Sequence, residues 1–470
     1  MLQALLNVFR VKDLRNKVLF TIAMLAVYRI GFWIPLPGVD QTALAELFAN
    51  QAEDSGAFGR VAEYVATFSG GTFSQSTIFG LGIMPYISAA IIFQLLASVY
   101  EPIKKMQQEG PTGRQRVQEW TRYATIALCV IQAFGWLTFL RSQNIVYPEW
   151  MQNPVWWIGS ITAMTAGTVF LMWLGEQIDK YGIGNGVSLI ITASILTQMP
   201  GAVGWIVENS PMHEWFGGAA KESYSLSLMH VIFMGVGFFF VVAGAVLITV
   251  AQRRIPVQRA KHTRGRKVFG GQRSYLPLRV NHGGVMPIIF ASSLMIFPSV
   301  IAAQVAGSFP DAGIGKSIAN FFSQNLDPGA YLYVLAFIVL TYFFSYFWTT
   351  IQFNPEDMSK QLRDHGSFIP GLRPGPRTEE YLETVMERVT YVGGGFLAII
   401  AVLPMILYGR LNVDFAVASF FGGTGLLIVV SVGLDLIQRI EANLLMRNYA
   451  GFLGGEDRGG KGTKIRGPRS

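Results

Sequence analysis

Long apolar segments recur along this chain and constrain its fold more than any other feature. Ten windows of about 19 residues are apolar enough to cross a bilayer, near 18–36, 76–98, 120–140, 155–175, 184–206, 228–251, 284–305, 331–353, 389–408 and 416–438. About 20 apolar residues make one helical span, whereas a membrane β-barrel shows short alternating segments. Only 14% of the residues are charged. We therefore predict an all-α polytopic membrane protein.

The lysines and arginines of the loops indicate how these spans are oriented. With a cytoplasmic N-terminus, the inner segments carry 31 of the 37 basic residues, the outer loops carry 5, and Arg29 lies in the first span. Basic residues concentrate in the cytoplasmic loops of membrane proteins. The distribution predicts ten spans with both termini in the cytoplasm, and it accounts for most of the net charge of +8.

Ten spans divide into two halves of five, so a repeat in the second half has to run upside down relative to the first. We place the N-terminal half at 1–206, an outer connecting loop at 207–227, the C-terminal half at 228–440, and a basic, Gly-rich cytoplasmic tail at 441–470, its end expected to be disordered. Inverted repeats place a pathway at the interface of the halves. Both a protein pore and a secondary transporter of a small solute fit this arrangement.

The stretch 68–98 is too long and too interrupted for one ordinary span. It holds about 31 residues where roughly 20 suffice, and Gly80, Gly82 and Pro85 break its apolar run. Broken backbone at membrane depth persists where it is buried in protein or lines a watery cavity. We expect a short half-helix and a hinge here, followed by the second span.

Residues with catalytic chemistry are sparse. The five histidines lack metal-ligand spacing, and the glycines of 182–186 do not match the GxGxxG spacing of a dinucleotide site. We predict no enzymatic activity, no cofactor and no metal site. Arg29, Glu176 and Asp435 fall near span ends, where charged side chains reach the interface. A coupled transporter is expected to bury charge at mid-span, which weighs against the transporter.

Two long inner loops favour a docking surface for a large partner. Segment 252–283 carries nine basic residues and no acidic ones. Segment 354–388 opens with Asn354, a proline and two acids, which together predict a capped helix. Three prolines and two glycines in 369–376 then predict a stiff turn that presents Arg373 outward. The alternative is that these charges only orient the spans.

Sequence blocks along nearly the whole chain carry a family resemblance. They begin with Arg15–Phe20 and Tyr28–Gly31, end with Phe421–Thr424, and include FSGG, LGIMPYIS, EGPTGR with TRY, MWLGEQIDKYGIGNGVS, LPLRVNHGGVMPIIFASS, FNPEDM and FIPGLRPGPRT. In this ordered set the chain resembles the SecY family, the channel subunits of the bacterial Sec protein translocase.

The resemblance implies a protein-conducting pore between the two halves, closed at its waist by a ring of apolar side chains and from outside by a short plug. The ring positions fall on Ile83, Ile87, Val187, Ile191, Ile289 and Ile428. The plug falls within 68–76, with Phe68, Ser69, Gly70, Gly71, Thr72 and Phe73 as its residues. Val187 departs from the isoleucine that is commoner in the family.

The resemblance also implies a lateral gate and several partners. The gate seam lies between the second and seventh spans, near Gln94 and Asn281, where signal sequences partition into membrane lipid. The motor ATPase SecA and the ribosome dock on the inner loops, and SecE and SecG complete a heterotrimer in the bacterial cytoplasmic membrane. The docking contacts fall on Arg264, Arg266, Lys267 and Arg373.

Overall fold

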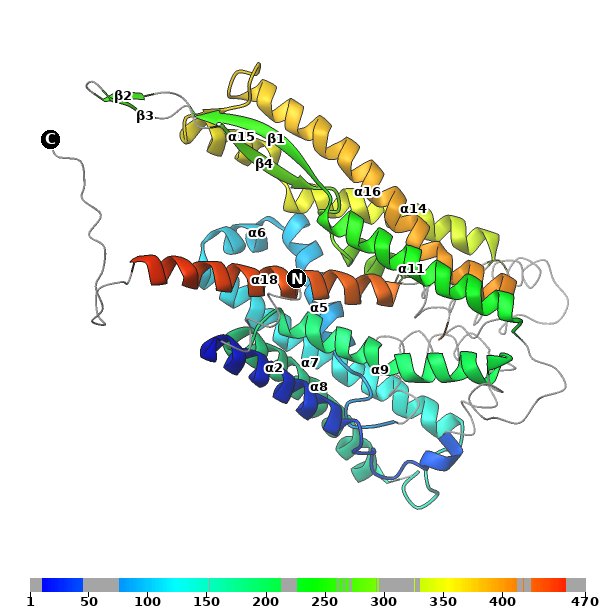
Figure 1. Cartoon of the computed structure of the whole chain (residues 1–470). Helices are drawn as coiled ribbons and strands as arrows, with labels where there is room; N and C mark the ends of the chain where they lie inside the picture. The colour runs from blue at the N-terminus through cyan, green and yellow to red at the C-terminus, as the bar shows by residue number, and fades with distance from the viewer. Residues whose placement is uncertain are drawn as a thin grey trace, which may run out of the picture.

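The computed structural model is mostly helical (Figure 1). It describes residues 11–44, 76–151, 153–212, 226–259, 262–264, 267–269, 273–292, 294–295, 325, 330–411, 417 and 424–453. The helices are α2 (Lys12–Gly31), α5 (Met84–Val99), α6 (Glu101–Gln108), α7 (Pro111–Ser142), α8 (Pro154–Tyr181), α9 (Gly186–Glu208), α11 (Leu228–Val250), α14 (Tyr331–Gln352), α15 (Pro355–Asp364), α16 (Pro376–Leu411) and α18 (Thr424–Leu453).

Prolines and asparagines mark where many of these helices begin. A proline occupies one of the first two positions of α5, α6, α7, α8 and α15. The missing N–H is harmless there, because the first turn of a helix has no partner for it. Asn153, Asn185 and Asn354 cap α8, α9 and α15, and each side chain accepts a backbone N–H two or three residues further on. The capped helix predicted at Asn354 is confirmed.

Six of the described helices are long and apolar enough to cross a membrane, namely α7, α8, α9, α11, α14 and α16. Helix α5 is apolar but shorter. Phe239 and Phe240 of α11 are both 68% exposed, and exposed apolar surface on this scale calls for a lipid environment. The chain is a multi-pass membrane protein. The number of spans and the side on which the termini lie stay predictions.

Several predicted boundaries are wrong. The second span was expected from residue 76, but α5 begins at Met84 and residues 76–83 form turns. Helix α7 extends well beyond the apolar window predicted for it, because its polar first turns continue the helix outside the apolar stretch. The second part of the predicted span 284–305 lies outside the described residues, as do the plug residues 68–73.

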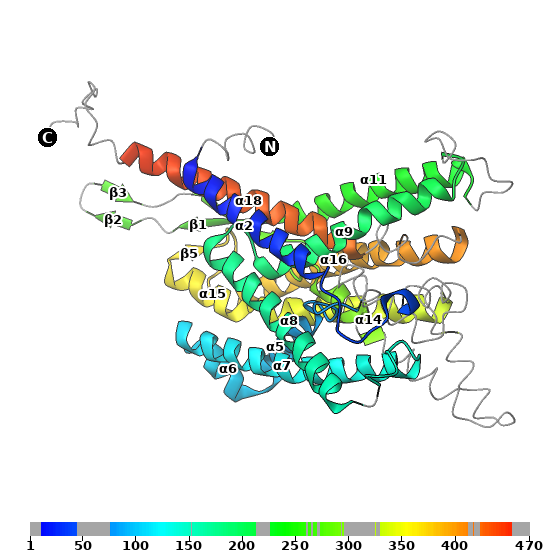
Figure 2. The same ribbon diagram turned by 90° about the horizontal axis from the view of Figure 1, so that it is seen from below.

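Helix α18 contacts both α9 and α11 and thereby joins two groups of helices. In Figure 1 it runs between α2, α7, α8 and α9 on one side and α11, α14 and α16 on the other. Figure 2 shows α2 beside the outer part of α18, where Leu14 and Ile440 are buried together with Ile183. The first and last described helices therefore pack on each other at one end of the molecule.

The basic segment 252–283 folds largely into strands, which the sequence did not predict. Strand β1 (Gln252–Arg259) pairs antiparallel with β4 (Arg273–Arg279) and, at its end, with β5 (Ser367–Phe368), in the order β4-β1-β5. Strands β2 (His262–Arg264) and β3 (Lys267–Phe269) form a separate pair beyond it (Figure 1).

This sheet has its own apolar core with α15 and the first part of α16. We call it the sheet cluster. Its buried members are Ile255, Val257, Leu278, Phe353, Ile369, Leu382, Val385, Met386 and Val389.

Candidate functional site

Four of the six predicted ring residues are buried in one apolar cluster, which we call the central cluster. Their side chains are 2–8% exposed, and they come from the start of α5, from α9, from the helical segment 286–292 and from α18. The four are Ile83, Ile191, Ile289 and Ile428. Ile87 and Val187 pack against the same cluster. The structure thus brings all six positions together, while their role as a ring stays a prediction.

Ile83 and Ile87 are positioned by the turns that precede α5. Ile83 is the N-cap residue of α5, and its carbonyl accepts the backbone N–H of Ile87 at 3.1 Å. The preceding Gly82 has φ of 57°, a left-handed conformation that glycine adopts without steric cost. The two isoleucines therefore lie one helical turn apart at the very start of the helix.

Val187 and Ile191 are positioned by a tight connection between α8 and α9. The carboxylate of Asp179 accepts the backbone N–H of Gly186 at 2.7 Å. A Cβ on Gly186 would lie 2.0 Å from the carbonyl oxygen of Gly175, so the two helices approach through their backbones. The glycines of this connection thus serve helix packing, and they place Val187 in the first turn of α9.

Ile289 and Ile428 enter the central cluster from the other group of helices. The side chain of Asn281 donates to the carbonyl of Gly284 at 2.9 Å and closes the turn that leads to Ile289. Ile428 lies in α18 next to Leu427, which is buried in a second cluster formed by α11, α14 and α16. One helix, α18, therefore takes part in both clusters.

The predicted gate residues belong to α5 and to the turn before the segment 286–292, and both elements contribute to one apolar cluster. Ile91 and Leu95 of α5 pack against the cluster that contains Ile288 and Ala291. Gln94 is half-buried on α5. Asn281 uses its amide within its own turn. Both segments contribute side chains to one apolar cluster, and the lateral gate with its two polar residues stays a prediction.

Two of the charged residues predicted to reach the interface are in fact paired. Glu176 of α8 lies 2.7 Å from the guanidinium of Arg122 on α7, and Asp435 accepts a hydrogen bond from Arg439 one turn further along α18. The clustered ring positions themselves are apolar. An apolar constriction excludes ions by dewetting and imposes no chemical preference on a passing chain. Among the described residues no three His, Cys, Asp or Glu side chains gather as metal ligands.

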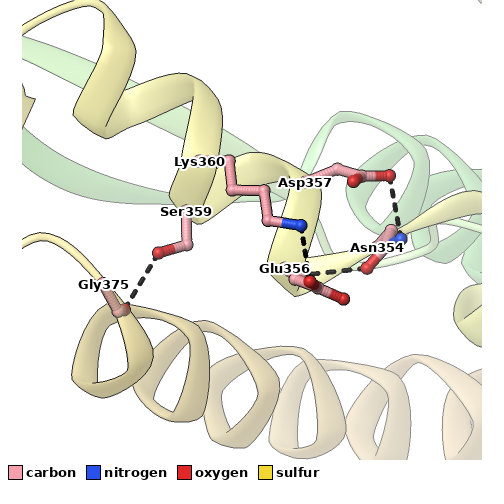
Figure 3. A network of polar contacts seen from close by, with 6 residues as sticks. All are labelled: Asn354, Glu356, Asp357, Ser359, Lys360 and Gly375. Atoms are coloured by element: carbon pink, nitrogen blue, oxygen red, sulfur yellow. Dashed lines mark hydrogen bonds and ion pairs between the residues drawn. The ribbon is translucent and has the colours of Figure 1, made fainter.

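The loop that carries Arg373 is held between α15 and α16. The hydroxyl of Ser359 on α15 donates to the carbonyl of Gly375 at 2.9 Å (Figure 3). Thr378 donates to the carbonyl of Arg373 itself at 2.8 Å. The Arg373 side chain is exposed, so the predicted outward orientation is found. Its partner stays a prediction.

The same network fixes the start of α15. Asn354 donates from its side chain to Asp357 at 2.8 Å, and Lys360 pairs with Glu356 (Figure 3). The hydrogen bond and charge of Lys360 lower the pKa of Glu356. Two other predicted docking residues belong to the pair of strands β2 and β3: Arg264 ends β2 and Lys267 begins β3. Arg266 lies outside the described residues.

The sequence did not predict the polar contacts that join distant segments at this site. Tyr28 of α2, a buried member of the central cluster, and Ser194 of α9 are hydrogen-bonded through their hydroxyls. Trp136 of α7 donates to Ser76 at 3.1 Å. Tyr28 belongs to one of the family blocks, which was the available signal, but no local pattern connects it to a residue 166 positions away.

These features define a multi-pass helical membrane protein with an apolar cluster where four separate segments of the chain meet. The SecY family profile matches residues 77–437, and the chain belongs to the SecY family. The protein translocase subunit SecY of Thermotoga maritima is 38% identical over 473 residues, which cover 100% of this chain and 100% of that relative.

Two solved structures share the fold at lower identity. One is the structure of a SecY protein whose plug domain stabilises the closed state of the translocation channel and maintains a membrane seal. It is 20% identical, with a TM-score of 0.58 and coverage of 94% of each chain. The other is Sec61 in the canine ribosome–channel complex from the endoplasmic reticulum, 18% identical, with a TM-score of 0.55 and the same coverage.

Proposed function

We propose that this chain is the central pore subunit of a protein-conducting channel, which translocates unfolded preproteins across the bacterial cytoplasmic membrane and inserts membrane proteins laterally into it. One observation carries the proposal: the six ring positions gather in the central cluster of a chain that belongs to the SecY family. The SecY relative from Thermotoga maritima is a protein translocase subunit.

The apolar ring seals the resting channel and yields to a passing chain. Its six side chains come from four separate segments, and the packing between them is non-directional. Small displacements of these segments widen the ring without breaking a hydrogen bond between its members. The side chains then close around a peptide of varying bulk and keep ions out by dewetting.

The pore lies between two inverted halves of five spans, 1–206 and 228–440, with both termini and the tail 441–470 in the cytoplasm. The distribution of basic residues over the loops supports this topology. The plug, residues 68–73, closes the outer funnel and swings on Gly70 and Gly71.

The seam between α5 and the segment 286–292 is the lateral gate, with Gln94 and Asn281 beside it. The packing of Ile91 and Leu95 against the apolar cluster to which Ile288 belongs supports the choice of these two elements. An apolar signal helix leaves through this seam into lipid.

The strand-containing end receives the cytoplasmic partners. The segment 252–283, which contains strands β1 to β4, carries basic residues without acidic ones. Its main sheet packs on the capped helix α15 and on the sheet cluster. SecA and the ribosome dock there through Arg264, Arg266, Lys267 and Arg373, and the motor supplies the energy of transport. SecE and SecG bind the lipid-facing surface of the bundle and complete the heterotrimer.

The seal tests the proposal. We expect the double substitution of Ile83 and Ile191 by serine to make resting vesicles that contain the reconstituted heterotrimer leak ions, because hydroxyls wet the constriction. Ile400→Ser is the matched control: Ile400 is 2% exposed but belongs to the cluster between α11, α14 and α16. Preprotein transport by SecA is measured on the same vesicles. Tight vesicles, or transport of a small solute in place of protein, would overturn the proposal.

A further inference from the structure

The turns before α5 are anchored by backbone hydrogen bonds to the segment that follows α2. The carbonyl of Ser76 accepts the N–H of Leu36 at 2.9 Å, and the N–H of Ile78 donates to the carbonyl of Ile34 at 3.1 Å. Residues 76–82, which we call the anchor turn, therefore behave as part of the packed interior.

Ser76 holds a backbone conformation that serine rarely adopts. Its φ is 42°, and its side chain is fully buried. A residue other than glycine in the left-handed region costs free energy and persists where its surroundings over-determine it. Ser76 therefore needs contacts that hold it.

Trp136 supplies such a contact from a different helix. Its indole N–H donates to the hydroxyl of Ser76 at 3.1 Å. The indole is only 3% exposed and lies in an apolar cluster together with Leu36 and Leu81. It also stacks on Phe139 with ring centroids 5.4 Å apart. The donor is thus fixed by packing on α7, and the acceptor belongs to the anchor turn.

Close contacts with α8 and α2 hold the anchor turn in a single position. A Cβ on Gly167 of α8 would lie 2.3 Å from the carbonyl oxygen of Ile78. A Cβ on Gly31 of α2 would lie 1.8 Å from the ring of Phe79. The turn then passes directly into Ile83, the N-cap of α5 and a member of the central cluster. A shift of the turn must therefore move Ile83.

We propose that Trp136 is a positioning residue of the channel, which holds Ser76 in its left-handed conformation and so fixes the anchor turn and the place of Ile83 in the seal. Trp136 acts through Ser76 and does not belong to the central cluster. The inference rests on the proposed function only in calling the central cluster a seal. The coupling of Trp136 to Ile83 is tested separately from transport.

The test measures how well Ile83 is protected. Ile83→Cys is placed in a Cys129→Ala background, because Cys129 is the only cysteine of the chain. The reconstituted heterotrimer is treated with a water-soluble maleimide, and the labelling rate is measured. One hydrogen bond contributes about 1 kcal/mol net. Trp136→Phe and Ser76→Ala are therefore each expected to raise the labelling rate roughly fivefold, and the two together no more than either alone.

Glycine at position 76 separates positioning from simple loss of packing. Glycine adopts a positive φ without needing the hydroxyl. We expect Ser76→Gly to keep labelling near the original rate, and to reverse most of the increase caused by Trp136→Phe. Trp156→Phe is the matched control, because its buried indole donates to the carbonyl of Pro37 and makes no hydrogen bond to the anchor turn. It should change labelling less than twofold.

Two results would overturn the inference. One is an unchanged labelling rate in both Trp136→Phe and Ser76→Ala. The other is an increase in Trp136→Phe that Ser76→Gly does not reverse, since the indole would then act by packing alone. Failure of the proposed function looks different: vesicles carrying serine at Ile83 and Ile191 stay tight, whatever the labelling rates are.

Discussion

The central cluster and the sheet cluster are both built from buried apolar side chains, yet different interactions surround them. At the ring positions of the central cluster, four separate segments meet through apolar side chains. The sheet cluster lies under a strand ladder in which Ile255 pairs with Leu276 and Val257 with Ser274, and a capped helix covers it.

The difference fits the two tasks proposed for these regions, a seal and a docking surface. Apolar packing has no preferred direction, so a ring made from it can open and close again around different chains. Hydrogen bonds fix distance and angle. They therefore keep a docking surface in one shape while the helices behind it move. The two regions should accordingly respond independently to substitution, and three predictions test this.

The largest effect is expected from Leu382→Ala in the sheet cluster. Leu382 of α16 is fully buried, and removing such a side chain costs about 3 kcal/mol. We expect faster hydrogen exchange in β1 and β4 and weaker coupling to SecA, with no change in the resting ion leak. Leu397→Ala is the control, because it makes the same change on the same helix within the cluster between α11, α14 and α16. If Leu382→Ala caused an ion leak as large as the double substitution of Ile83 and Ile191 by serine, the two regions would not be independent.

A smaller effect is expected from Arg373→Ala on the docking surface. The side chain is exposed, so thermal stability should not change. Hydrogen bonds to charged groups contribute about 2 kcal/mol, so binding of SecA should weaken by at least tenfold. Arg373→Lys should recover only part of the loss, because lysine lacks the planar fork. Lys104→Ala on α6 removes another exposed charge and serves as the control. If Arg373→Ala and Lys104→Ala lowered the affinity for SecA equally, Arg373 would contribute only general positive charge and no specific contact.

The smallest effect is expected from Val187→Ile in the ring. Val187 is half-buried against the central cluster, and one added methylene contributes about 0.8 kcal/mol. We expect a resting leak about fourfold lower, measured as single-channel events in a planar bilayer. Val155→Ile adds the same group at a site that is 70% exposed on α8. A higher leak in Val187→Ile would mean that the ring is already fully packed and that the added methylene displaces its neighbours.

The sequence by itself determined the elements whose causes are local. Runs of about 20 apolar residues define spans, and the order Asn354, proline and two acids defines the start of α15. It also determined the exposed position of Arg373, since prolines and glycines on both sides restrict that turn. Strand β1 had a weak sequence signal, because Ile255 and Val257 are two residues apart, as on one face of a strand. The many charged residues around them obscured this alternation.

Only the tertiary structure decided where the segments meet. No periodicity within α5 or α18 indicates that Ile83 and Ile428 share a cluster. The second span starts only at Met84, because Ser76 and Ile78 form backbone hydrogen bonds to the segment after α2, which a local pattern cannot reveal. The hydrogen bond from Trp136 to Ser76 spans 60 positions. Helix periods and caps act within a few residues, whereas packing joins residues that only the folded chain brings together.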